Sequence, residues 1–178
     1  MSEAPLVDSE GHGLVPDGDG WFVLNARDTR WLTAELGDYC NFEAPGVRFP
    51  QLGINLNRLE PGQSMTMYHR ENEQEDFLVL AGECVLIVEG EERPLRQWDI
   101  FHCPAGVAHA IVGAGEGPSL VLAVGSRSGG ESGIVYPADP VAQRHGAAVA
   151  VETSEPREAY ARFSFTWRAY EPGWLPGD

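Results

Sequence analysis

Short apolar runs recur along the chain, separated by glycine, proline and acidic residues. From about residue 47 onward, these runs follow one another at a roughly ten-residue spacing that is typical of strands joined by turns. The predicted strands are Ile54–Leu59, Ser64–Arg70, Asp76–Ala81, Cys84–Glu89, Arg93–Leu95, Ile100–Cys103, Ala108–Val112 and Leu120–Gly125. The pattern predicts an all-β sandwich or barrel.

The segment before residue 47 is predicted to be an N-terminal extension, residues 1–46, with a strand and a short helix. Residues 1–20 are rich in Gly and Asp and are expected to be loose, and the strand is Trp21–Leu24. Asp28 can cap a helix that runs to Leu36, because its side chain can accept from the first free N–H groups and Gly37 can end the helix.

The barrel is predicted over residues 47–126, followed by a C-terminal extension over residues 127–178. Residues 127–133 are expected to form a flexible connector before an added strand, Ile134–Tyr136. Short helices are expected where Asp139 and Glu155 each precede a proline. The aromatic tail from Phe163 onward is expected to pack on the barrel or on a second subunit.

Charge narrows the function classes. The chain has 12 arginines, no lysine and 27 acidic residues, which gives a net charge of −15. Such a surface repels phosphate backbones and anionic lipids, so nucleic acid and membranes are excluded as expected partners. Without lysine there is no Schiff-base chemistry and no lysine-dependent nucleotide loop. We find no secretory signal pattern and no apolar run long enough for a membrane helix, so a cytoplasmic location is expected.

Three cysteines, Cys40, Cys84 and Cys103, form neither an even set nor a CxxC pair. This spacing argues against a disulfide framework and against a cysteine zinc site, and it predicts buried, reduced thiols.

Candidate chemistry lies in the predicted strand Ser64–Arg70 and just beyond it. Alternation places Met65, Met67, His69 and Glu71 on one face. The methionines make this face apolar, so it should point into the barrel. A buried histidine beside a buried carboxylate needs partners, and a divalent metal ion is one such partner.

A second histidine re-enters the predicted sheet after a rigid corner, Pro104-Ala-Gly106, at His109. With Glu75 at the start of the preceding strand, two histidines and one or two carboxylates converge from separate strands. Such a set matches the ligand chemistry of first-row divalent metals. The other interpretations are a solvated acidic turn for Glu71 and Glu75, and a buried histidine bonded to backbone for His109.

Taken together, the two motifs resemble those of the cupin superfamily, the double-stranded β-helix or jelly-roll proteins. Gly62, His69-x-Glu71, Glu75 and Gly82 are similar to the first family motif, and Asp99 with Pro104-x-Gly106-x-x-His109 is similar to the second. The resemblance covers roughly residues 47–126. It implies an all-β cupin barrel with short flanking helices.

Three positions depart from the family pattern. Glu71 stands where the second histidine of a His-x-His pair is usual, Trp98 stands where a glycine is usual, and Gly62 is one residue farther from His69 than expected. A literal count would put Tyr68 and Arg70 at the His-x-His positions and leave no metal site. A one-residue bulge near the strand start would instead absorb the difference.

Carried over by position, the resemblance implies the metal ligands His69, Glu71, Glu75 and His109. Two carboxylates would neutralise a divalent ion and favour manganese or iron over copper, and zinc also fits. If only His69, Glu75 and His109 bind, the set resembles the facial triad of non-haem iron oxygenases. The expected pocket is lined by Met65, Met67 and Phe77.

Two functions fit this resemblance. One is a metal-dependent enzyme of oxygenase, isomerase or decarboxylase type that acts on a small molecule, and the other is a non-catalytic binding or sensing module. The family also implies a homodimer. His102 lacks a motif position and is expected to have a packing or supporting role, and Cys84 and Cys103 are expected to pack in the core.

Overall fold

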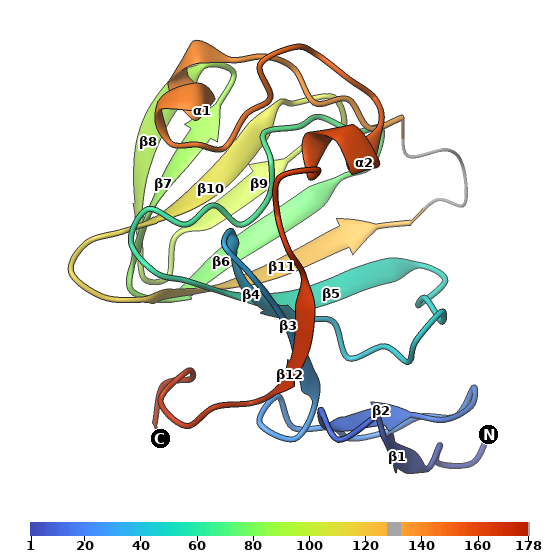
Figure 1. Ribbon diagram of the computed structural model, residues 1–178. Helices are drawn as coiled ribbons and strands as arrows, with labels where there is room; N and C mark the ends of the chain where they lie inside the picture. The colour runs from blue at the N-terminus through green and yellow to red at the C-terminus, as the bar shows by residue number, and fades with distance from the viewer. Residues whose placement is uncertain (128–132, 178) are drawn as a thin grey trace.

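The computed structural model describes residues 1–127 and 133–177, and antiparallel strands dominate it (Figure 1). The strands are β1 (Leu6–Asp8), β2 (Leu14–Pro16), β3 (Arg30–Ala34), β4 (Gly37–Cys40), β5 (Leu52–Leu59), β6 (Glu75–Ala81), β7 (Glu83–Val88), β8 (Glu91–Arg96), β9 (Ile100–Cys103), β10 (His109–Ala114), β11 (Ser119–Ser126) and β12 (Thr166–Ala169). The helices are α1 (Pro140–Arg144) and α2 (Pro156–Ala159). None of the helices in these residues is long and apolar enough to cross a membrane.

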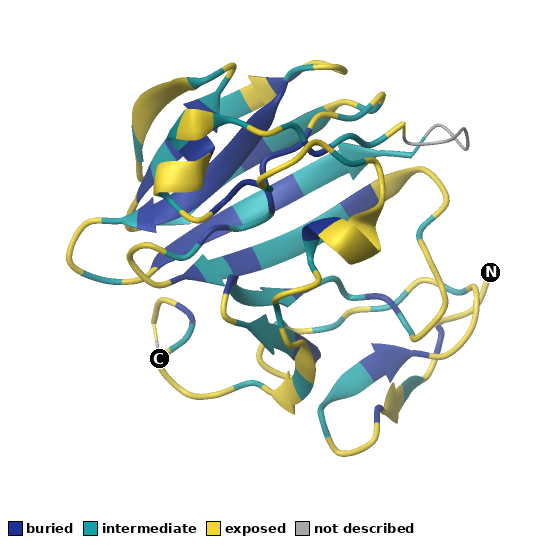
Figure 2. Ribbon diagram, turned by 45° about the horizontal axis from the view of Figure 1, so that its top comes forward, coloured by how far each residue is buried: buried dark blue, intermediate teal, exposed yellow. Residues whose placement is uncertain are grey.

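Two sheets face each other across the barrel. The larger has the strand order β12-β3-β4-β5-β11-β6-β9 and the smaller has the order β10-β7-β8. The barrel interior, where both sheets turn their apolar faces inward, is filled by a cluster that includes Leu59, Phe77, Val79, Ile111 and Val121. Figure 2 shows buried residues along these facing strands and exposed residues on the turns. The all-β jelly-roll prediction is confirmed.

The strands predicted from Ile54–Leu59 and from Asp76 onward correspond to β5 to β11, with ends displaced by a few residues. The helix predicted after Asp139 is also present: the Asp139 carboxylate accepts from Ala142 N–H at 2.8 Å, and Gly146 ends the turn with φ of +66°. Residues Ile134–Tyr136 make isolated bridges through Val135 and Tyr136. Most of the predicted connector, residues 128–132, lies outside the described residues.

The predicted helix Asp28–Leu36 is wrong, because residues Arg30–Ala34 form strand β3. Trp31 is fully buried on the outer face of the sheet, under the C-terminal tail, while Leu32 points to the other face. Pairing with β4 and β12 satisfies the backbone that a helix would have satisfied internally. β-branched and aromatic residues at Trp31 and Thr33 suit that environment.

Two other predictions for the N-terminal segment are wrong. Residues 1–20 contain the hairpin β1–β2, in which Val7 pairs with Val15 around a turn closed by Ser9 and Gly13. The predicted strand Trp21–Leu24 makes only a bridge from Trp21 to Glu3. Trp21 and Val23 are largely exposed, so this short apolar run has no core to bury it.

The tail from Thr166 packs on the outer face of the larger sheet. β12 pairs with β3, and Trp174 contacts Trp31 edge-on at 5.5 Å between ring centroids. Leu175 is buried in the same cluster as Leu120 of β11. The extensions on both sides of residues 47–126 therefore share hydrogen bonds and a core with the barrel strands.

Candidate metal centre

The two motif histidines meet through their backbones. His69 N–H donates to the His109 carbonyl at 3.1 Å, and His109 N–H donates to the His69 carbonyl at 2.8 Å. This bridge places the two imidazole rings side by side, with centroids 4.8 Å apart. His69 and His109 are 5% and 1% exposed. The chain thus buries the two rings beside each other.

The segment Ser64–Arg70 does not form the regular strand that the sequence predicts. Ser64 bridges Val112 and His69 bridges His109, so five steps on one side face three on the other. The extra residues bulge out of the ladder, and simple alternation from Met65 to Glu71 does not hold across them. The bulge nevertheless delivers His69 to His109, and the literal count that would replace it with Tyr68 does not apply. Tyr68 packs outside the smaller sheet.

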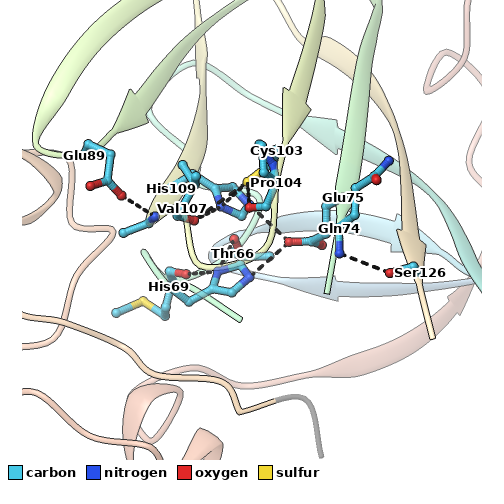
Figure 3. A network of polar contacts seen from close by, with 12 residues as sticks. Thr66, His69, Gln74, Glu75, Glu89, Cys103, Pro104, Val107, His109 and Ser126 are labelled. Carbon is cyan, nitrogen blue, oxygen red and sulfur yellow. Dashed lines mark hydrogen bonds and ion pairs between the residues drawn. The ribbon is translucent and has the colours of Figure 1, made fainter. Parts of the chain in front are cut away.

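Glu75 completes a three-residue group with the histidines, as Figure 3 shows. Its Oε2 lies 3.3 Å from His109 Nε2 and 3.6 Å from His69 Nε2. The three candidate ligand atoms all lie within 4.8 Å of one another. Donors bound at about 2.1 Å to one ion would lie roughly 3.0–3.5 Å apart, so a small inward adjustment would suit a shared metal.

In each ring, the partner of Nδ1, the nitrogen that faces away from Glu75, determines which nitrogen carries the proton. His69 Nδ1 lies 2.8 Å from the Met67 carbonyl, and His109 Nδ1 lies 3.2 Å from the Val107 carbonyl. A carbonyl oxygen can only accept, so each Nδ1 carries the proton and each neutral ring turns a bare Nε2 lone pair toward Glu75.

Two of these inward atoms have no hydrogen-bond partner. Glu75 Oε2 and His109 Nε2 are both buried and lie 3.3 Å apart, and neither makes a hydrogen bond among the described residues. Buried acceptors that face one another without a donor cost free energy, whereas a divalent cation would bind all of them. The donor set therefore fits a first-row metal ion, and in cation-free protein a protonated imidazole would have to take its place.

In metal-free protein, a proton on the imidazole rings takes the place of the ion and sets the electrostatics of the group. Burial alone would raise the pKa of Glu75, but the His109 and His69 rings outweigh burial and lower the pKa to about 2. Burial tends to lower the pKa of His69, and the facing Glu75 reverses that effect, so the pKa of His69 is raised. Glu75 is thus an anion at neutral pH, as a metal ligand must be.

Glu71, the fourth predicted ligand, is not part of the three-residue group. Burial and repulsion by Glu75 raise the pKa of Glu71 to about 7. Its carbonyl accepts from Gly106 N–H at 2.7 Å, so the corner of the second motif holds the Glu71 backbone beside the site. Whether Glu71 ligates stays a prediction.

The three predicted pocket residues lie in different surroundings. Met65 lines a cavity of about 1020 Å³, whose wall comes mainly from the larger sheet and the C-terminal segment. Phe77 packs in the barrel core, with its ring centroid 5.2 Å from that of His109. Met67 is buried in a separate cluster with Leu36 and Tyr136. Of the three, only Met65 is part of that cavity's lining.

The remaining candidates behave as packing or surface groups. His102 pairs with Asp76 across β6 and β9 at 2.6 Å, on the face opposite Glu75. All three cysteines are free and buried, as predicted, and burial raises the pKa of Cys103 to about 12. Sequence reasoning missed Tyr136, whose ring lies 6.0 Å from His69. No motif marks it, because it arrives from the C-terminal segment.

Comparison with known families decides the domain type. Residues 55–125 match the family described as Cupin domain. The chain contains a cupin domain. The match includes His69, Glu75 and His109 and ends before the C-terminal extension. No curated protein sequence matches the chain.

Several solved structures are similar to parts of this chain. A candidate sugar phosphate isomerase from Acidithiobacillus ferrooxidans is 31% identical over 51% of this chain and 59% of that protein, with a TM-score of 0.46. A sugar phosphate isomerase from Silicibacter pomeroyi is 22% identical over 76% and 87%, with a TM-score of 0.48. KdgF from Halomonas is 23% identical over 51% and 80%, with a TM-score of 0.44. The match therefore spans less than two thirds of the Acidithiobacillus protein.

Proposed function

We propose that His69, Glu75 and His109 bind a divalent metal ion and that the cupin domain acts on a small molecule at this centre. The observation that carries the proposal is the convergence of His109 Nε2 and Glu75 Oε2, both buried and without a hydrogen-bond partner, beside His69 Nε2. Imidazole and carboxylate donors suit iron, manganese or zinc.

A bound ion would supply Lewis acidity to a substrate oxygen and lower the pKa of bound water. The chain's own residues have three further tasks. His69 and His109 are held in one tautomer by their backbone partners, Phe77 and the barrel core keep water from one side of the centre, and Glu71 can hold or release a proton near neutral pH. This set favours isomerase, oxygenase or decarboxylase chemistry over covalent catalysis by a side chain.

Elemental analysis of purified protein tests the metal centre. We expect near-stoichiometric iron, manganese or zinc in the wild type and at least tenfold less in His69→Ala and His109→Ala, because each change removes a ligand. His102→Ala is the matched control, since His102 lies on the opposite face of the sheet. Full metal content in both ligand variants would refute the assignment.

The same preparations separate the reaction types. Oxygen consumption by iron-loaded protein with phenols, diketones or thiols would identify an oxygenase, and its absence would favour an isomerase or a non-catalytic binding module. The expected assembly is a homodimer, as the family resemblance implies, and light scattering of the full chain measures it.

A further inference from the structure

The large cavity carries an unusual charge for so acidic a protein. Its lining includes four arginines and two carboxylates, although the whole chain has a net charge of −15. The arginines are Arg30, Arg48, Arg127 and Arg157, and the carboxylates are Asp38 and Glu43. A concave region that concentrates positive charge in an acidic protein would attract small anions.

Both cavity carboxylates are already paired. Asp38 accepts from Arg58 at 3.1 Å, and Glu43 accepts from Arg127 at 2.6 Å. Arg127 also donates to the Phe49 carbonyl at 2.8 Å. Among the described residues, no carboxylate lies within ion-pair distance of Arg30.

Arg30 is nonetheless 7% exposed, which is unusual for an unpaired cation. Its guanidinium lies 3.8 Å from the ring centre of Trp167 and makes one long hydrogen bond, 3.4 Å, to the Glu43 carbonyl. Its Nε is buried with no partner. Glu10 attracts the guanidinium from a distance without forming an ion pair with it. Burial of a charge without a directly paired counter-ion is costly, so this geometry suits an anion supplied from outside the chain.

A second unpaired polar group faces the same cavity. Asn55 Oδ1 is buried without a hydrogen-bond partner, and an amide in that position would bind a hydroxyl or amine. The strand register connects this amide to the metal centre: Asn55 pairs with Ala123, which pairs with Phe77, next to His109. Two strand spacings, about 10 Å, separate Asn55 from Phe77.

In the neighbouring row of the sheet, two glycines lie between Arg127 and Glu75. Glu75 pairs with Gly125, and Gly125 pairs with Gly53. A Cβ at Gly53 would lie 2.9 Å from the Arg127 guanidinium, so the glycine lets this guanidinium lie directly against the strand. Thr66 also lines the cavity, with its hydroxyl 3.5 Å from His69 Nδ1. Arg30 of β3 and Glu75 of β6 therefore lie on the same face of the larger sheet.

We propose that this cavity binds a small anionic molecule that carries hydroxyl or amine groups, with Arg30 binding the anionic group and Asn55 binding a hydroxyl or amine. Carboxylates and phosphate esters share the required chemistry. Binding of the anion is independent of the proposed metal function. The further step, that this anion is also the substrate, rests on that function.

Calorimetric titration of the His109→Ala protein tests the site apart from the metal, because the probes could otherwise bind a metal ion directly. The probes are acetate, inorganic phosphate, gluconate and glucose 6-phosphate, with glucose as the neutral control at matched ionic strength. We expect binding of anions and none of glucose. A preference for gluconate or for glucose 6-phosphate would identify the anionic group as carboxylate or phosphate.

Matched variants assign the residues. Arg30→Gln and Arg30→Met, each introduced beside His109→Ala, should weaken anion binding by about tenfold or more, because a charge-assisted hydrogen bond is lost. Asn55→Leu should weaken gluconate binding while leaving phosphate binding unchanged. Arg93→Gln, at an exposed pair with Glu91 on β8, is the control. Retained melting temperatures in the Arg30 variants would show that they fold.

Two outcomes would overturn the inference: no anion binds better than glucose, or anions bind equally well after both Arg30 substitutions. If anions bind through Arg30 but the wild type holds no metal, the anion site stands and the proposed metal function fails. If metal binds at His69 and His109 but no anion binds, the proposed metal function stands and the anion site fails.

Discussion

The fixed tautomers of His69 and His109 explain how the candidate centre is prepared before any ion arrives. Each Nδ1 donates to a carbonyl two residues earlier in the chain, Met67 or Val107. These short-range bonds orient the rings without help from a distant partner. Once the backbone bridge between the two histidines has formed, both Nε2 atoms therefore point to Glu75.

Proton competition should make metal binding depend on pH. In metal-free protein, Glu75 raises the pKa of His69 above its ordinary value of 6.5, and metal requires the neutral ring. Affinity for Mn²⁺ should therefore fall as the pH decreases through that raised pKa. Titrations of the metal-free protein at pH 8, 7 and 6 measure the change, with about tenfold weaker binding per pH unit once the ring is protonated. Equal affinity at pH 8 and 6 would contradict the assignment.

The raised pKa of Glu71 predicts how the free energy of unfolding of the metal-free protein depends on pH. Its carboxyl ionises near pH 4.5 when unfolded and near pH 7 when folded. The contribution of Glu71 to the free energy of unfolding is therefore complete below pH 4.5. It is lost as the pH rises toward 7, because the folded state resists ionisation of this carboxyl. Glu71→Gln should raise the free energy of unfolding at pH 8 by about 1–2 kcal/mol, a value reduced for solvent screening.

Urea denaturation of metal-free protein at pH 4 and pH 8 measures this effect. The Glu71→Gln and wild-type proteins should have similar stability at pH 4 and differ at pH 8. Glu116→Gln, an exposed substitution in the turn before β11, should change neither value. A wild type that gains stability on Glu71 ionisation would show that some cation already compensates the carboxylate. Loss of metal affinity in Glu71→Gln would in turn identify Glu71 as a ligand.

At the level of elements, the turn before β9 contains a strained residue. Trp98 occupies the left-handed region, with φ of +76°, although its side chain is 67% exposed. Its N–H donates to the Val79 carbonyl at 2.8 Å, so the sheet holds the backbone in place. The glycine that is usual here in cupins has no Cβ to strain, which explains the family preference that this chain breaks.

Trp98→Gly should therefore stabilise the protein by about 0.5–1 kcal/mol, because it relieves strain and removes few contacts. Thermal denaturation measures the gain. Trp98→Ala is the control, since alanine shortens the side chain and keeps the strained Cβ. If alanine stabilises as much as glycine, exposed indole and not backbone strain is the cause.

The elements that sequence reasoning predicted well are those whose pattern is local. Most of strands β5 to β11 are short runs rich in apolar residues, separated by turns that usually contain glycine or proline, and both motifs lie among them. The sequence of β3 predicts a helix because Asp28 and Gly37 resemble helix caps, and only pairing with β4 and β12 favours the strand. The bulge before His69 depends likewise on a partner strand, so spacing alone could identify His69 without giving its register.

At the scale of the whole molecule, the cavity could not be predicted for a related reason. Arg30, Arg48 and Arg127 come from segments on both sides of the cupin domain, and no motif connects them. In the sequence they are three of 12 scattered cations. Only the folded sheet shows which arginines are paired with Asp38 or Glu43 and that Arg30 is not.

The flanking segments should also fold together with the cupin domain as one cooperative unit. β3 and β4 extend the sheet through β5, and the tail covers Trp31 and Leu120 with Trp174 and Leu175. Trp174→Ala should lower the free energy of unfolding by about 2 kcal/mol, because a large half-buried aromatic side chain is removed from the core. The loss should appear in the whole protein and not in the tail alone.

Coincident thermal transitions by tryptophan fluorescence and by far-ultraviolet circular dichroism test that cooperativity. Both probes should shift together in Trp174→Ala, whereas Trp21→Ala, at a position that is 54% exposed, should leave both almost unchanged. A fluorescence transition that moves while the circular dichroism transition stays would mean that the tail unfolds separately. Because Trp167 lies on the same tail and stacks on Arg30, separate unfolding would also dismantle the anion site at a temperature where the barrel persists.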